Sequence, residues 1–184
     1  MSDGDIPNAF AASWTYELPI GKSHALHPSN VLGVIASGWR VSGIVTIQSG
    51  VPLAVTQGTN NLSYAGFGTQ RPNCSGNTAL SGDPRTLSKW FNTGAITVNN
   101  NQFALGTCSR NPVRGPTYQN ADFALLKTFP IHESMTLDFR AEAFNLTNTP
   151  PLGAPNTVAG TAAFGTITAA GDPRVLQFAL KFNF

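Results

Sequence analysis

The last residues of the chain read Arg174-Val-Leu-Gln-Phe-Ala-Leu-Lys-Phe-Asn-Phe184, and this stretch decides the fold. Large apolar side chains occupy alternate positions, namely Leu176, Phe178, Leu180, Phe182 and Phe184. The positions between them carry Val175, Gln177, Ala179, Lys181 and Asn183. Successive side chains of a β-strand point to opposite faces. The stretch therefore predicts a strand with one wholly apolar, aromatic face and one face of mostly small or polar residues.

Residues 135–146 repeat this alternation, with charge on the second face. One face carries Met135, Leu137, Phe139, Ala141 and Ala143, and the other carries Thr136, Asp138, Arg140 and Glu142. Three alternate charged residues suit the polar lumen of a membrane β-barrel better than a soluble core. We therefore expect a lumen charge network of Asp138, Arg140, Glu142 and Lys181, which Asp122 could join. A catalytic acid–base set is disfavoured, because i and i+2 side chains on one face lie ~7 Å apart.

Three further segments alternate in the same way, at residues 39–48, 118–129 and, more weakly, 10–18. Each is roughly ten residues long, which is the length that a tilted strand needs to cross a bilayer. Residues 19–38 link the first two strands, with a short helix expected near residues 30–37, and residues 130–134 are expected to form a tight turn. The connections 48–118 and 146–174 are long and rich in small and polar residues. We expect both to be external loops, and the longer one, 48–118, to lack regular structure.

Composition agrees with an all-β membrane protein. Hydrophobic residues make up 41% of the 184 residues and charged residues only 11%, against about 25% charged in soluble domains. There is no run of ~18 apolar residues that could form a membrane helix. The net charge of +2 is small and unclustered, which argues against a nucleic-acid partner. The start, Met1 to Asp5, lacks the apolar core of a signal peptide, so we expect a fragment of a longer exported protein.

The candidate chemical groups are few. Cys74 and Cys108 both fall in the long loop 48–118, where a disulfide is favoured over two free thiols and would contribute roughly 3–4 kcal/mol. Two cysteines without a nearby histidine cannot complete a zinc site. The three histidines, His24, His27 and His132, are expected in turns, and none pairs with a nucleophile in a known motif. We therefore expect no enzyme activity, no metal and no cofactor.

A series of short phrases then suggests a family. In order they are Tyr16-Glu-Leu-Pro-Ile-Gly21, Gly38-Trp-Arg-Val-Ser-Gly-Ile44, Gln48-Ser-Gly-Val-Pro-Leu53, Arg71-Pro72, Trp90-Phe-Asn92, Gly115-Pro116 with Asn120-Ala-Asp122, Lys127-Thr-Phe129, Phe139-Arg-Ala-Glu-Ala-Phe-Asn145, Phe164-Gly165 and the final Phe184. With these phrases the chain resembles the C-terminal part of TonB-dependent receptors, in particular the Oar-like group that carries an N-terminal carboxypeptidase-regulatory-like domain. The resemblance covers nearly the whole chain.

The resemblance implies a location and a role. Receptors of this family form a barrel of about 22 strands around a plug, so residues 1–184 would be a C-terminal fragment of the barrel domain, with about five antiparallel strands and long external loops. The chain would lie in the outer membrane and contact its lipid. Phe178, Phe182 and Phe184 would form a C-terminal signal for the barrel assembly machinery. The parent receptor would use the TonB system, through its missing N-terminal part, to take up a siderophore, cobalamin or an oligosaccharide.

An alternative from another class is a secreted β-sandwich for binding or adhesion, because alternating strands and loops rich in Asn, Thr and Gly also fit that fold. The apolar faces distinguish the two hypotheses. A sandwich buries its apolar faces against a second sheet, whereas a barrel exposes them to lipid.

Overall fold

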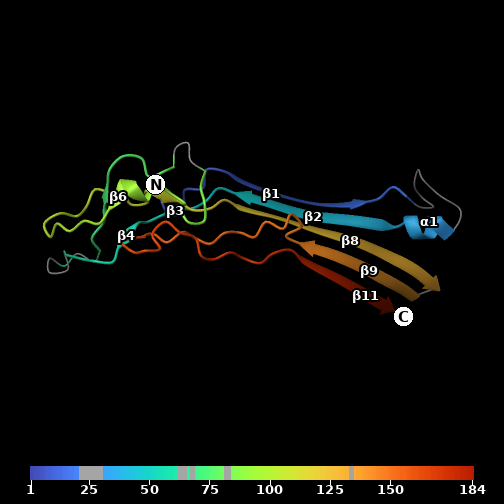
Figure 1. The fold of residues 1–184 in the computed structure, drawn as a ribbon. Coiled ribbons are helices and arrows are strands. Elements are labelled where there is room, and N and C mark those ends of the chain that lie inside the picture. Colours follow the sequence, from blue (N-terminus) through green and yellow to red (C-terminus); the bar gives the residue numbers. More distant parts are fainter. Residues whose placement is uncertain (21–30, 62–65, 67–68, 81–83, 133–134) are drawn as a thin grey trace. The chain divides into compact units, whose positions relative to one another are not determined.

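A computed structural model describes residues 1–20, 31–61, 66, 69–80, 84–132 and 135–184. Its five long strands form one sheet in the order β1-β2-β8-β9-β11, which is also their order along the chain. They are β1 (Ala9–Glu17), β2 (Trp39–Gln48), β8 (Tyr118–His132), β9 (Met135–Phe144) and β11 (Val175–Asn183). Neighbouring strands run in opposite directions (Figure 1). The predicted antiparallel all-β fold with five long strands is confirmed.

The chain forms two compact units, each built from segments far apart in the sequence. The sheet unit consists of Phe10–Ile47, Gln119–Pro150 and Asp172–Phe184. The loop unit consists of Met1–Ala9, Gln48–Tyr118 and Pro151–Gly171.

Within the sheet unit most strand limits match the expected ones to within two residues. The helix expected near residues 30–37 is also present, as α1 (Val31–Ala36). The start of the tight turn expected at 130–134 is wrong, because β8 continues through Pro130 to His132, which pairs with Met135 of β9. Pro130 pairs with Thr136, and the register is irregular between Pro130 and His132. A bulge of this kind lets a strand accommodate proline, which has no N–H to donate to the ladder.

The loop unit corrects a second expectation, that residues 48–118 lack regular structure. Its short strands are two residues long and form three pairs: β3 (Pro52–Leu53) with β7 (Val113–Arg114), β4 (Thr56–Gln57) with β10 (Val158–Ala159), and β5 (Asn73–Cys74) with β6 (Ile96–Thr97). A 3-10 helix, η2 (Thr93–Ala95), directly precedes β6. They surround a buried apolar cluster of Val55, Phe91, Ile96, Cys108, Val113 and Ala159. The small core explains the regular structure in the described parts of this connection.

The first residues of the chain are held to the loop unit by charge. The Arg110 guanidinium lies 2.7 Å from an Asp3 carboxylate oxygen, and that of Arg114 lies 2.6 Å from Asp5. Asn111, which is buried, donates through Nδ2 to Asp3 Oδ1 at 2.6 Å. These contacts join segments more than a hundred positions apart in the sequence.

Candidate functional site

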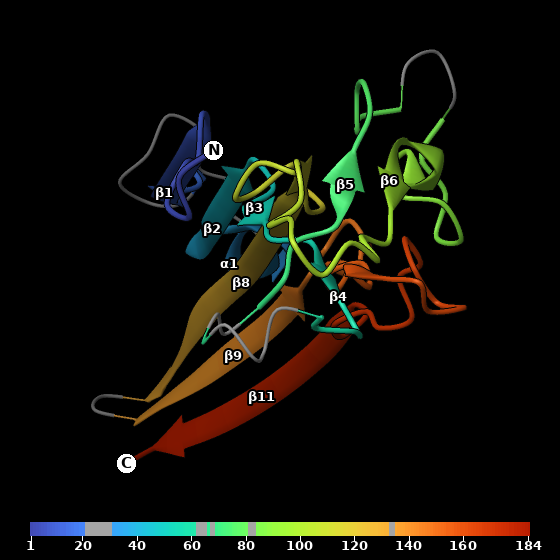
Figure 2. The ribbon, with the colours of Figure 1, turned by 90° about the vertical axis from the view of Figure 1, so that its left-hand side faces the viewer.

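The sheet has one polar face, set by the register of its strands. In the pairing of β9 with β11, Asp138 lies opposite Lys181, Arg140 opposite Ala179 and Glu142 opposite Gln177. Since side chains alternate along each strand, the four residues predicted for the lumen network share one face. Figure 2 shows β8, β9 and β11 side by side along their length.

Hydrogen bonds and ion pairs connect the polar side chains of this face. Asp138 accepts from Thr128 Oγ1 at 2.7 Å and from Asn183 Nδ2 at 2.8 Å. Arg140 Nε lies 3.5 Å from Glu142 Oε1. Asp122, which we expected to join the network, instead accepts from the backbone N–H of Asn145 at 2.9 Å. Asn145 has a positive φ of 50°, so the Asp122 carboxylate supports the turn after β9.

The polar face continues onto β1 and β2. Arg40 pairs with Glu17 at 3.0 Å, and Thr15 and Ser42 hydroxyls lie 3.2 Å apart. A cavity of about 430 Å³ opens over this face. Its lining includes charged residues of this face, namely Arg40, Arg140, Lys181 and Asp138. The face is therefore a hydrated surface of mixed charge, as a barrel lumen requires.

The opposite face is apolar and exposed. Leu176, Phe178 and Leu180 of β11 are 58%, 70% and 67% exposed, and their partners on β9 are Ala143, Ala141 and Phe139. On the same face of β2, the Trp14 ring of β1 fills the space where a Cβ at Gly43 would lie. Exposure of this many large apolar side chains on one sheet face is costly in water and is expected against lipid.

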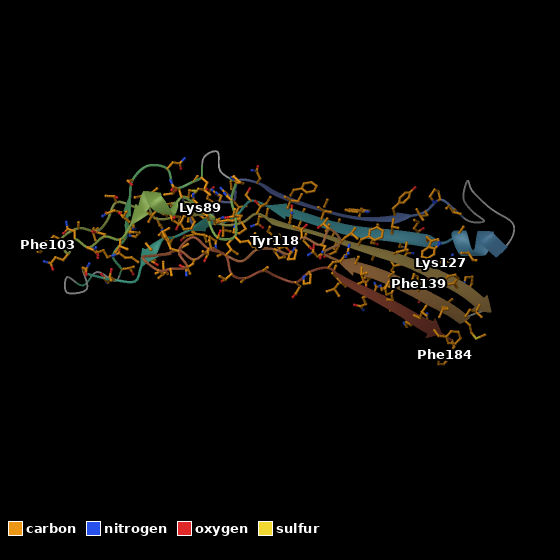
Figure 3. The ribbon with its side chains drawn as sticks, viewed as in Figure 1. Lys89, Phe103, Tyr118, Lys127, Phe139 and Phe184 are labelled. Atoms are coloured by element: carbon orange, nitrogen blue, oxygen red, sulfur yellow. A yellow bond between two sulfur atoms is a disulfide. The ribbon has the colours of Figure 1, made fainter. Side chains whose placement is uncertain are left out.

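Lys127 is the exception on this apolar face, and sequence reasoning missed it. It pairs with Phe139 in the register of β8 and β9, yet it is only 3% exposed. Its ammonium donates to the backbone oxygens of Ile35 at 2.6 Å and Ser37 at 2.5 Å, at the end of α1. It also lies over the rings of Trp39 and Phe129, at 5.1 and 4.7 Å from their centroids. Figure 3 shows its place on the sheet. Lys127 thus anchors α1 to the sheet.

Of the residues predicted as an assembly signal, Phe178 and Phe182 lie on the apolar face of β11, and Phe184 follows directly after the strand. The rings of Phe182 and Phe184 are stacked, with centroids 6.1 Å apart. Phe184 is 94% exposed. All three rings are exposed.

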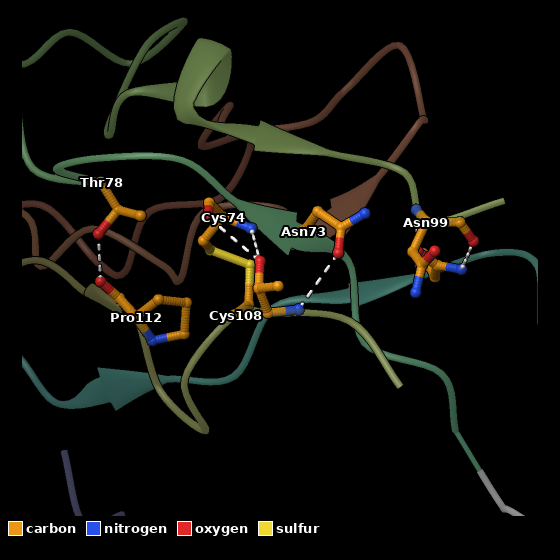
Figure 4. Close-up of a disulfide and its surroundings, with 8 residues drawn as sticks. Asn73, Cys74, Thr78, Asn99, Cys108 and Pro112 are labelled. Atoms are coloured by element: carbon orange, nitrogen blue, oxygen red, sulfur yellow. Dashed lines mark hydrogen bonds between the residues drawn. A yellow bond between two sulfur atoms is a disulfide. The ribbon is translucent and has the colours of Figure 1, made fainter. Parts of the chain in front are cut away.

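Cys74 and Cys108 form a disulfide in the loop unit (Figure 4), with Cα atoms 4.6 Å apart. Thr107 reinforces the crosslink: its hydroxyl accepts from the backbone N–H of Cys74 at 3.0 Å, and its own backbone N–H donates to Asn73 Oδ1 at 3.2 Å. Cys108 belongs to the buried apolar cluster. The disulfide therefore joins β5 to the core of the loop unit.

The described residues present no group of three or more His, Cys, Asp or Glu side chains that could hold a metal ion. His132 is in β8, paired with Met135, rather than in the turn where we expected it. His24 and His27 lie outside the described residues. No helix in the described part of the chain is long and apolar enough to span a membrane.

A single sheet with one charged face and one exposed apolar face is the wall of a membrane β-barrel. A family model for the outer membrane beta barrel domain matches residues 1–177. The chain belongs to this family, and its place is the outer membrane. No curated protein and no solved structure gives a significant match to the chain.

Proposed function

We propose that residues 1–184 form the C-terminal barrel segment of a TonB-dependent receptor. The parent protein would take up a scarce ligand of the siderophore, cobalamin or oligosaccharide type. The observation that carries the transport role is the register of β9 and β11, because it places Asp138, Arg140, Glu142 and Lys181 on one face and the large apolar residues on the other. A wall with this division can separate lipid from a hydrated lumen.

The number of strands supports a larger barrel. Bacterial outer-membrane barrels have an even number of antiparallel strands, eight at least. The sheet has five, and its edge strands β1 and β11 run in the same direction (Figure 1). Copies inserted in one orientation would therefore pair β1 with β11 in parallel. An antiparallel barrel needs an odd number of further strands, which favours completion by the rest of a longer receptor.

The TonB assignment is supported by the ordered phrases that resemble this receptor family, from Tyr16-Glu-Leu-Pro-Ile-Gly21 to the final Phe184. On this proposal the TonB system supplies energy through a part of the receptor that precedes the chain. The chain itself has no enzyme activity and no cofactor, and it binds no nucleic acid. Its partners are outer-membrane lipid, the assembly machinery and a small ligand.

The β-sandwich alternative gains no support from a specific observation. A sandwich would cover the apolar face of the sheet with a second sheet. In the described ranges the remaining strands are two-residue pairs, and they pack around the separate core of the loop unit.

The uptake role is tested in cells whose only copy of the receptor is the full-length parent protein. We would measure accumulation of labelled ferric siderophore, cyanocobalamin and maltohexaose, with the TonB system intact or deleted. We expect one ligand class to accumulate above the level of receptor-deleted cells, and only when TonB is present. Accumulation that survives the loss of TonB would refute TonB coupling and leave the barrel assignment intact.

The assembly role of Phe184 is tested by deleting that residue from the parent protein. Phe184 is 94% exposed, so its removal costs little packing, and slower insertion would reflect lost recognition by the assembly machinery. Pulse-chase labelling with the heat-modifiable gel shift of the folded barrel measures the insertion rate. Replacement by Tyr, which keeps the aromatic ring, is the control. Insertion at the normal rate without Phe184 would contradict the role.

A further inference from the structure

The C-terminal end of α1 meets the sheet on its apolar face. Lys127, whose ammonium donates to the backbone oxygens of Ile35 and Ser37, pairs with Phe139, and Phe139 pairs with Leu180. Figure 3 shows Lys127 and Phe139 on the sheet. Past this level, each of the three strands carries another large apolar residue on the same face, namely Phe129, Leu137 and Phe182. The contact with α1 therefore lies within the apolar band of the sheet.

Side chains of the sheet supply the hydrogen bonds that this helix end needs. The last turn of a helix leaves carbonyl oxygens without a partner inside the helix. The Ile35 oxygen accepts from Lys127 Nζ at 2.6 Å and from Trp39 Nε1 at 2.9 Å. Water could bond such carbonyls at the surface of a soluble protein, whereas in lipid every backbone polar group needs a protein partner. The end of α1 is therefore equipped for an environment without water.

The helix itself offers only apolar and small residues. Its sequence is Val31-Leu-Gly-Val-Ile-Ala36, without a charged or polar side chain. Gly33 is buried, whereas Ile35 is 54% exposed, and residues two positions apart lie on roughly opposite sides of a helix. A helix that is apolar on all sides belongs in a protein core or in lipid. No described part of the chain covers the exposed half of Ile35.

The lengths of the connections identify the side of the membrane on which α1 lies. Outer-membrane barrels have short periplasmic turns and long external loops. Only residues 133–134 separate β8 from β9, whereas residues 49–117 connect β2 to β8. Lys127 belongs to the half of β8 that ends at this short connection. The end of the sheet that holds α1 is therefore the periplasmic end.

We propose that α1 is embedded in the periplasmic leaflet of the outer membrane, on the lipid side of the barrel wall, with Ile35 against phospholipid acyl chains. The apolar face of the sheet already meets lipid beside it, so α1 extends that surface. Lys127 and Trp39 supply the donors that lipid cannot offer to the helix end. Tryptophan is also common at the level of the headgroups, which suits the place of Trp39. The inference is independent of TonB and of any transported ligand.

The test is fluorescence quenching of the full-length protein in vesicles of phosphatidylethanolamine and phosphatidylglycerol. Ile35→Cys carries a fluorescent label, and the two native cysteines do not react because they form a disulfide. The quenchers are phospholipids with a nitroxide near the headgroup or near the end of the acyl chain, and iodide in the water. We expect the label at position 35 to lose fluorescence to the nitroxide lipids, most with the nitroxide near the headgroup. Iodide should have little effect on it.

Two labelled variants are the controls. Leu87→Cys is the matched one, because Leu87 in the loop unit is 55% exposed, almost the same as Ile35. Its label should be quenched by iodide and not by the nitroxide lipids. Phe178→Cys, in the apolar band of β11, should be quenched by the nitroxide lipids and not by iodide. The heat-modifiable gel shift of the folded barrel verifies the fold of each variant.

Either of two results would overturn the inference. Quenching of the label at position 35 by iodide but not by the nitroxide lipids would mean that α1 lies in periplasmic water. Quenching by neither would mean that another segment of protein covers it. The experiment requires neither TonB nor a ligand, so both results would leave the proposed uptake role as it stands. Loss of TonB-dependent uptake would equally leave the place of α1 unchanged.

Discussion

The sheet unit and the loop unit place their large apolar side chains in opposite ways. Phe178 and Leu180 on the sheet are 70% and 67% exposed, whereas Phe91 and Val113 in the loop unit are both 3% exposed. The loop unit buries a small apolar core, as a structure surrounded by water must. The sheet leaves its largest side chains outside, which is favourable only against lipid. The two units are therefore built for different solvents within one short chain.

The largest expected effect tests the loop unit. Cys74→Ala with Cys108→Ala should destabilise it by about 3–4 kcal/mol, because the disulfide closes a long segment of the chain. The sheet makes no use of this crosslink. We therefore expect rapid proteolysis within residues 48–118 while the heat-modifiable shift of the barrel is retained.

Mass mapping of the native protein without reductant should first find Cys74 and Cys108 in one crosslinked peptide pair. Wild-type protein treated with reductant is the control for the double variant. Equal protease resistance with and without the crosslink would show that the small apolar core is sufficient.

The next effect tests which side of the sheet meets lipid. Phe178→Arg should cost about 2–4 kcal/mol in the membrane, whereas Gln177→Arg on the hydrated face should cost far less. The measurement is the heat-modifiable gel shift in outer-membrane fractions of cells that make the protein. A one-residue slip exchanges the two faces. The reverse result would therefore mean that the assignment of faces is inverted, and no effect from either variant would exclude a membrane strand.

A smaller effect is expected at Lys127, the buried cation on the apolar face of the sheet. Lys127→Met keeps the length of the side chain but leaves the carbonyls of Ile35 and Ser37 without their charged donor. We expect a loss of about 1.5–3 kcal/mol, the usual range for a hydrogen bond to a charged group. The unfolding midpoint in urea, read by the gel shift, measures it.

Leu125→Met, on the same face of β8, is the matched control for Lys127→Met and should be almost neutral. Lys127→Arg should retain much of the stability. A more stable Lys127→Met protein would show that lipid contact outweighs the anchoring of α1.

The smallest effect is expected for the exposed ion pair of the polar face. Glu17→Gln removes the partner of Arg40, but both side chains are more than half exposed. Such pairs contribute less than about 1 kcal/mol, and salt screens them. The unfolding midpoint should hardly change, and any change should vanish in high salt. A large, salt-resistant loss would mean that the lumen face excludes water.

Much of the sheet could be predicted from sequence because its signal is local. The period of two in residues 174–184 and 135–146 gave the correct faces for both strands, and the pairing of β9 with β11 joins them in that register. The start of the turn expected at 130–134 was misplaced, because an irregularity in the register accommodates Pro130 within β8. The prediction that Asp122 joins the lumen network missed its actual partner, because Asn145 lies 23 positions away and takes a positive φ.

The sequence by itself determined the class of this protein, which is a sheet of antiparallel strands with one lipid-facing and one hydrated side. This could be read from the sequence because the alternation of side chains along a strand depends only on neighbouring residues. Only the tertiary structure decided that the long connections fold. Their order depends on pairs such as Gln57 with Asn99, 42 positions apart, and on Cys74 with Cys108, 34 apart. The burial of Lys127 depends on α1, 92 positions away at Ile35. Contacts between residues so distant leave no periodic pattern in the sequence, because each contact forms only after folding has brought its two residues together.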